Sequence, residues 1–237
     1  MSNLISIIVT KRLREDANIT LDSLAKQTFQ DFTITISEDS GGKGANWTRN
    51  KGFYLAPKAK YVLFSDNDIQ WEPNALANLF YCLEENPEAS YCYGSYMVDN
   101  HIHCDRDFDE GSLKIRNYIS TMTLIRYNDF PCFDEKINKL QDWDLWLTML
   151  EQGKKGISCG KLIFTTEKKP GITYGNSLSR EEAIRIVKLK HGMIQKIPKK
   201  RHKEAIIMRF RRITFKKLLD LLFKKLILMR HILKIKV

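Results

Sequence analysis

Two short acidic motifs hold the side chains best suited to chemistry, namely Asp66-Asn67-Asp68 and Asp142-Trp143-Asp144. The first motif follows the apolar run 61–65, which predicts a buried strand ending at Asp66. Two carboxylates at this spacing, where a strand reaches a loop, offer the oxygen ligands that Mg²⁺ or Mn²⁺ prefers. A solvated turn that caps a helix is the alternative interpretation of this pair.

The same Asp-x-Asp spacing recurs at Asp105-Arg106-Asp107 in a polar loop, and the 142–144 copy lies inside a helical pattern. Neither of these two copies follows a strand, so the 66–68 copy is favoured as a cation site. A divalent cation there would neutralise a diphosphate and make it a better leaving group.

Strands and helices alternate along the part of the chain that must position these motifs. We expect strands at 4–9, 31–37, 61–65, 90–98, 120–125 and 161–166, and helices at 19–27, 45–55, 73–83 and 140–152. Asn18 is expected to cap the first helix, Pro73 to open the third and Gly153 to end the fourth. The alternation predicts a doubly wound α/β fold with a mostly parallel sheet and ligands at the carboxyl ends of its strands.

Composition restricts the class of protein. The 237 residues are 43% hydrophobic, which is ordinary for a folded globular chain and argues against disorder. The longest uncharged stretch, 73–83, is shorter than the roughly 18 apolar residues that span a bilayer. The N-terminus lacks the features of a signal peptide, and five cysteines fit reduced thiols, so we expect a cytoplasmic protein.

Basic charge is concentrated at the C-terminus. Residues 196–237 hold 15 of the 39 Lys and Arg residues but only two of the 28 Asp and Glu residues. Apolar residues recur there at steps of three and four, which predicts a basic amphipathic helix. It could lie on an anionic membrane surface through residues 198–237, pack on the domain or on a second subunit in a homodimer, or bind nucleic acid; the apolar stripe disfavours nucleic acid.

Several motifs occur in an order and spacing typical of one enzyme family. They are the strand 5–10, Gln27-Thr28-Phe29-Gln30-Asp31-Phe32, Glu38-Asp39-Ser40, Arg49-Asn50-Lys51-Gly52, Asp66-Asn67-Asp68, and Phe133-Asp134-Glu135 leading to Asp142-Trp143-Asp144. Because of these motifs, the chain resembles an inverting glycosyltransferase of family 2 with the GT-A fold over about residues 4–179. The resemblance implies a catalytic domain at 1–195, with a nucleotide-sugar half at about 1–99 and an acceptor half at about 100–195, followed by a membrane-associating tail at 196–237.

The resemblance also implies a role for each motif. The nucleotide sugar would contact Thr10, Glu38, Asp39, Arg49, Asp66 and Asn67, and Asp68 with Asp66 would hold Mn²⁺ or Mg²⁺. Asp142 would be the general base, and Trp143 and Asp144 would face the acceptor. From the residues alone, Arg49 could equally form a salt bridge on a helix surface, Asp142 could be an acidic residue on an amphipathic helix, and Trp143 could belong to the core.

Two departures from the family pattern concern the site. Gln141 stands where the family usually has Glu before the base. Because the base itself, Asp142, is present, we expect its activity to be adjusted rather than lost. The segment 172–179 lacks the histidine that many relatives carry near the metal, and Tyr174 could replace it by hydrogen bonding.

The function that these features indicate is metal-dependent transfer of a hexosyl or N-acetylhexosaminyl group from a UDP-sugar to a hydroxyl of a bacterial surface-glycan precursor. The acceptor would be lipopolysaccharide, capsule or a polyprenyl-linked oligosaccharide, at the inner face of the cytoplasmic membrane. A catalytically silent protein that docks on membranes or on a partner is the alternative. A sugar-nucleotide pyrophosphorylase is disfavoured because the segment after the first strand, 10–15, has no glycine, and zinc at His101-Ile102-His103-Cys104 is disfavoured by its spacing.

Overall fold

The computed structural model describes residues 3–103, 106–167 and 178–195. The chain divides into two compact units, Met1–His191 and Gly192–Val237. The expected C-terminal helix at 196–237 and Tyr174 lie outside the described residues. No helix within the described ranges is long and apolar enough to cross a membrane.

One mixed sheet forms the centre of the first unit, with strand order β2-β1-β3-β7-β5-β8-β4 and β6 paired to β5. The strands are β1 (Ile5–Arg12), β2 (Phe32–Asp39), β3 (Tyr61–Asp66), β4 (Gln70–Trp71), β5 (Tyr91–Val98), β6 (His101–His103), β7 (Leu124–Arg126) and β8 (Gly156–Thr166). The expected parallel arrangement holds for β2-β1-β3 and for β5-β8. Most of the paired residues therefore lie in parallel ladders, as expected, and the short β7 adds an antiparallel strand between β3 and β5.

The helices of this unit are α1 (Asn18–Ala25), α2 (Ala45–Leu55), α3 (Ala75–Glu85), α4 (Glu110–Ile115), α5 (Gln141–Glu151) and α7 (Arg180–Lys190), with a 3-10 turn η1 (Tyr127–Asp129). The first four expected helices are confirmed within a few residues. Asn18 does not cap α1, because Ala17 occupies that position and makes no side-chain bond. Gly153 follows α5 with a φ of +75°, a conformation that favours glycine.

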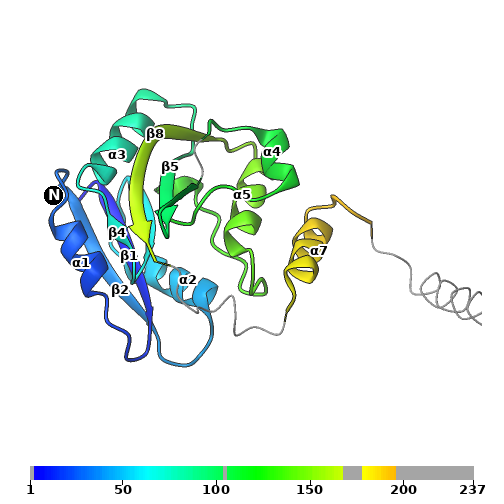
Figure 1. Cartoon of the computed structure of the whole chain (residues 1–237), viewed down its shortest axis with the longest axis horizontal. Helices are drawn as coiled ribbons and strands as arrows, with labels where there is room; N and C mark the ends of the chain where they lie inside the picture. The colour runs from blue at the N-terminus through cyan, green and yellow to red at the C-terminus, as the bar shows by residue number, and fades with distance from the viewer. Residues whose placement is uncertain (1–2, 104–105, 168–177, 196–237) are drawn as a thin grey trace, which may run out of the picture. The chain divides into compact units, whose positions relative to one another are not determined.

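Both faces of the sheet are covered by helices, as Figure 1 shows. Ile5 and Ile7 of β1 share a buried cluster with Leu24 of α1 and Leu79 of α3. On the other face α2 approaches closely at Gly52, where a Cβ would lie 2.4 Å from Ile8 Cγ2. This close approach requires glycine in the Arg-Asn-x-Gly motif and brings the side chains of α2 to the end of the sheet.

Candidate active site

A cleft of about 1350 Å³ opens beside the carboxyl ends of β1, β2 and β3. Parallel strands bring these ends to one edge of the sheet, which is the usual ligand position in such folds. The residues from the sequence analysis that line this cleft are Thr10, Asp39, Arg49, Asp66, Asn67, Asp68 and Asp142. The structure therefore brings both acidic motifs to one cavity, although they are far apart in the chain.

A buried arginine side chain holds Asp66 in place. The Arg49 Nη2 lies 2.8 Å from Asp66 Oδ1, and Arg49 is only 7% exposed. Thr10, opposite Asp66 in the parallel ladder, donates from its hydroxyl to the same oxygen at 3.4 Å. Arg49 does form a salt bridge, but the bridge lies in the cleft rather than on an outer helix surface.

The turn that carries Asp68 is fixed from α1. The Thr20 hydroxyl lies 3.0 Å from the carbonyl oxygens of Asp66 and Ile69 and accepts the Ile69 N–H. The Asn67 amide donates to the Asp16 carbonyl at 2.7 Å. Asn67 thus lines the cleft but uses its side-chain nitrogen to secure the loop that follows β1.

Asp39 is held by the backbone of the glycine-rich turn. Its carboxylate accepts the N–H groups of Lys43 at 2.9 Å and Gly44 at 2.8 Å. Burial raises the pKa of Asp39, but the backbone N–H groups of the turn outweigh it and hold the pKa below its ordinary value. Gly42 and Gly44 have φ of +65° and +97°, so the turn needs glycine at both positions.

Glu38 does not line the cleft, in contrast to the expected nucleotide contact. Its side chain points to the other face of β2 from Asp39, as the alternation of a strand requires. There it forms an ion pair with Lys11 at 2.6 Å. This pair braces β2 against β1, and Lys11 itself lines the cleft, so Glu38 acts on the cleft through its partner.

Asp142 lies in the first turn of α5 with a half-buried side chain. Its Oδ2 accepts from the Asn117 amide at 2.7 Å, and its Oδ1 accepts from the Trp143 N–H at 2.9 Å. Burial raises the pKa of this carboxyl, while the Trp143 N–H, the Arg49 charge and Asn117 act in the opposite direction without cancelling the rise. A carboxylate with a raised pKa is a stronger base, as proton abstraction requires.

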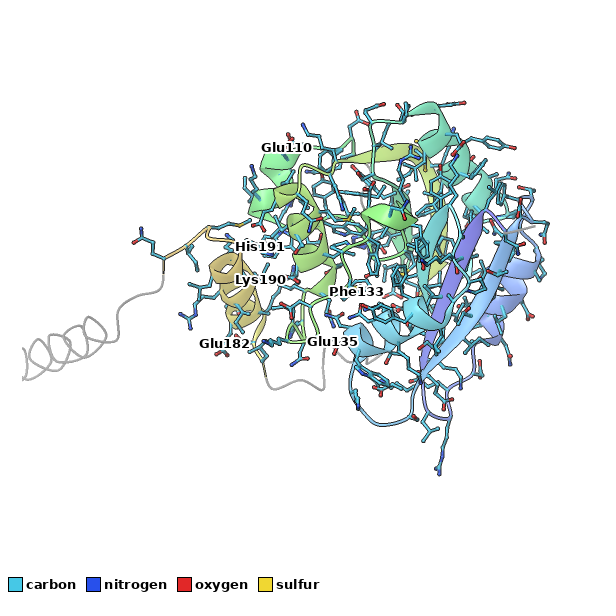
Figure 2. All side chains as sticks on the ribbon, turned by 180° about the vertical axis from the view of Figure 1, so that it is seen from behind. Glu110, Phe133, Glu135, Glu182, Lys190 and His191 are labelled. Carbon is cyan, nitrogen blue, oxygen red and sulfur yellow. The ribbon has the colours of Figure 1, made fainter. Side chains whose placement is uncertain are left out.

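Two asparagines of α2 secure the segment that precedes α5. Asn46 donates to the carbonyls of Asp134 at 2.7 Å and Ile137 at 3.0 Å. Asn50 donates to the Phe133 carbonyl and accepts the Phe133 N–H, both at 2.9 Å. Figure 2 labels Phe133 in this segment. The sequence analysis did not identify Asn46, although its spacing of four from Asn50 places both on one side of the helix.

Neither Trp143 nor Asp144 lines the cleft, but Trp143 lines a smaller pocket beside it. Trp143 is 2% exposed and donates its Nε1–H to the Leu113 carbonyl at 2.7 Å. Asp144 is 2% exposed and accepts from His191 Nε2 at 2.9 Å and Lys190 Nζ at 2.8 Å. Figure 2 shows Lys190 and His191 on the side of α7 that faces α5. Asp144 is thus a structural anchor for α7.

The cleft also contains basic side chains that the sequence analysis did not single out: Lys11, Arg12, Arg14, Lys139 and Arg180. The first three follow the apolar part of β1 directly, which could have indicated a phosphate-binding position at the carboxyl end of that strand. Lys139 and Arg180 come from segments far along the chain, and no local pattern marks them.

The cleft residues fit a divalent cation that is bound partly by protein carboxylates and partly by oxygens of a substrate. Within the described ranges, no three His, Cys, Asp or Glu side chains are grouped to hold a metal by themselves. Asp66 and Asp68 both line the cleft, and Mg²⁺ commonly binds one or two carboxylates together with phosphate oxygens. One oxygen of Asp66 is already bonded to Arg49, so Asp68 and the other Asp66 oxygen would be the protein ligands.

Solved structures of S. aureus TarS have the same architecture. One of them, TarS 1-349 in complex with UDP-GlcNAc, superposes with a TM-score of 0.65 at 15% identity, covering 80% of this chain and 66% of that one. The chain has the GT-A fold. A second, TarS 1-349 in complex with UDP, gives a TM-score of 0.58 at 17% identity, covering 87% of this chain and 70% of that one.

A third TarS structure gives a TM-score of 0.60 at 14% identity, and the match spans 79% of this chain but only 39% of that one. No protein-family profile matches the sequence, and no curated protein matches it. The likeness at this identity is one of fold.

Proposed function

We propose that the chain is an inverting glycosyltransferase of family 2 that moves a hexosyl or N-acetylhexosaminyl group from a UDP-sugar to an acceptor hydroxyl. The observation that carries this proposal is the single cleft that joins Asp39, the Arg49–Asp66 pair, Asp68 and Asp142. The shared fold with TarS, which has been crystallised with UDP and UDP-GlcNAc, supports a nucleotide-sugar donor.

The chemistry follows from the side chains of the cleft. Asp142 accepts the proton of the acceptor hydroxyl as that oxygen attacks the anomeric carbon and the nucleoside diphosphate leaves from the opposite face. Displacement in line inverts the anomeric centre, so one base suffices and no covalent intermediate forms. Arg49 orients Asp66 toward the donor, and Asp39 lies where the base of the nucleotide would bind. Bound Mn²⁺ or Mg²⁺ would neutralise charge on the leaving diphosphate.

The acceptor in this proposal is a bacterial surface-glycan precursor, and residues 198–237 bring the enzyme to an anionic membrane surface. The composition of that segment supports this, since each Lys or Arg near an anionic leaflet contributes about 1 kcal/mol. Deletion of 198–237 should abolish co-sedimentation with vesicles rich in phosphatidylglycerol and spare UDP binding. Vesicle binding that survives the deletion would exclude this role of the tail.

The experiment that tests the donor site is calorimetric binding of UDP, GDP, CDP and dTDP to the full chain, with Mn²⁺ and with EDTA. We expect selective UDP binding that weakens at least tenfold in EDTA and in Asp68→Ala. Asp22→Ala removes an exposed carboxylate of α1 outside the cleft and should bind UDP as the unmodified chain does. Binding of none of the four nucleotides would contradict the proposal and favour a catalytically silent docking protein.

A further inference from the structure

A second pocket of about 460 Å³ lies next to the cleft. The two cavities share Leu140 and Arg180 in their linings. Asn117 lines the second pocket and donates its amide N–H to Asp142 Oδ2 at 2.7 Å. A molecule bound in this pocket would therefore lie against the group that positions the proposed base.

The charge of this pocket differs from that of the cleft. Six acidic and six basic side chains line the cleft, so its charges balance. The second pocket is lined by Arg106, Arg116 and Arg180 and by no Asp or Glu among the described residues. None of the three arginines forms an ion pair within 4.0 Å of a described acidic residue. The charge of Arg106 does help to lower the pKa of Asp109, so Arg116 and Arg180 offer the more available charge to a ligand.

Arginine in such a setting favours particular ligands. Its planar guanidinium donates paired hydrogen bonds that match the oxygens of a phosphate or a carboxylate. Several guanidinium groups around one small cavity bind an anion more strongly than any one of them, because the ligand also relieves their mutual repulsion. The pocket is therefore built for an anionic group.

Aromatic rings and aliphatic side chains form most of the remaining lining. Tyr96 stacks on His103 with ring centroids 5.2 Å apart, and the guanidinium of Arg106 lies 5.3 Å from the centre of the Tyr118 ring. Trp143 also lines this pocket. Flat apolar surfaces beside a few polar groups are typical of small-molecule sites, and the apolar face of a pyranose ring packs well on them.

We propose that this pocket is the acceptor subsite and that it selects an acceptor sugar carrying a phosphate or carboxylate group. Arg106, Arg116 and Arg180 hold the anionic group, and the rings support the carbon skeleton, so that a neighbouring hydroxyl faces Asp142. This inference rests on the proposed function for the identity of the reaction. It adds the chemical class of the acceptor.

The test uses the full chain with its donor cleft filled by saturating UDP and Mg²⁺, so that the probes cannot occupy that cleft and no paramagnetic ion broadens their NMR signals. The probes are glucose 6-phosphate, glucuronate and glucose, and saturation-transfer NMR measures their binding in the millimolar range. We expect binding of one or both anionic sugars and at least tenfold weaker binding of glucose. Which anionic sugar binds then identifies phosphate or carboxylate as the recognised group.

Arg116→Gln is the decisive variant, since Arg116 is exposed and lines the second pocket but not the cleft. It should weaken the anionic probes about tenfold and leave UDP binding unchanged. Arg185→Gln is the matched control, because it removes an exposed charge of α7 that lines neither cavity. Equal binding of glucose and the anionic sugars, or equal affinity in Arg116→Gln and the unmodified chain, would overturn the proposal.

The UDP measurement separates this inference from the proposed function. If the chain binds UDP but binds glucose as tightly as the anionic sugars, the proposed subsite is wrong and the proposed donor site is still supported. Arg116-dependent binding of the anionic sugars by a chain that binds no UDP means that the pocket is an anion site but not an acceptor subsite of a glycosyltransferase, and this also overturns the inference.

Discussion

The two walls of the cleft are built in different ways. On the donor wall, made by β1 to β3 and α2, Asp39 is bonded to backbone groups four and five residues away. On the base wall, made by α5 and the segment before it, Asp142 is bonded to Asn117, 25 residues away, and that segment is bonded to Asn46, 88 residues from Asp134. The hydrogen bonds of the donor wall join residues that all lie between Thr10 and Ile69. The base wall instead depends on partners from α2, from the segment at Asn117 and from α7. The two walls should therefore respond differently to substitution.

Replacing Asp142 by Asn should separate the functions of the two walls most strongly. The amide cannot accept the acceptor proton, so transfer should fall at least a hundredfold and as much as ten thousandfold. UDP affinity should change less than twofold, because the contacts at Asp39, Arg49 and Asp68 remain. Steady-state turnover and calorimetry on the same preparations measure both, with Asp22→Asn as the control. Equal losses of turnover and UDP binding would remove Asp142 from the role of base.

Replacing Asn50 by Ala should show how the donor wall supports the base wall. The change leaves the buried N–H and carbonyl of Phe133 without partners, which costs about 2–3 kcal/mol of the free energy of unfolding. Since this segment leads to α5, turnover should fall about tenfold while UDP affinity holds. Urea denaturation and kinetics test this, and Asn78→Ala on α3 is the matched control. A loss of UDP affinity as large as the loss of turnover would contradict it.

The same difference explains what the sequence could predict. Asp39, Asp66 and Asp68 follow strands whose apolar pattern is readable, and parallel strands place their ends together, so the donor wall was predictable. Glu38 lies outside the cleft because side chains alternate along β2, and Asp144 because it is bonded to Lys190 and His191, which are 46 and 47 residues away. No local pattern shows such partners, nor the antiparallel β7 that makes the sheet mixed.

Replacing Arg49 by Met should affect both walls, because Arg49 bonds to Asp66 and its charge lowers the pKa of Asp142. We expect UDP to bind about tenfold more weakly, as for the loss of one charge-assisted hydrogen bond. Without the cation the pKa of Asp142 rises further, so the acidic limb of the kcat profile should move to higher pH. Lys51→Met, on the same helix but bonded to the Glu38 carbonyl, should move neither quantity. An unshifted limb would mean that Asp142 does not titrate in catalysis.

His191 supports the base wall through its bond to Asp144, outside the cleft. Its replacement should give the smallest effect, a change in stability alone. Burial lowers the pKa of His191, but its bonds to Asp144 and Glu151 outweigh this and raise the pKa above 6.5. Its contribution is therefore complete below pH 6.5 and is lost as the pH rises through the higher folded value. The loss should be on the order of 1 kcal/mol, as for one such hydrogen bond.

Urea denaturation of the unmodified chain and of His191→Gln between about pH 6 and pH 9 measures this loss. The difference between their curves isolates the histidine, which matters because the pKa of the Cys159 thiol, lowered to about 7, lies in the same range. The exposed His101→Gln is the control and should follow the unmodified chain at every pH. If the curves of His191→Gln and the unmodified chain are parallel, Asp144 anchors α7 through Lys190 alone, and the base wall needs one distant contact fewer than the structure indicates.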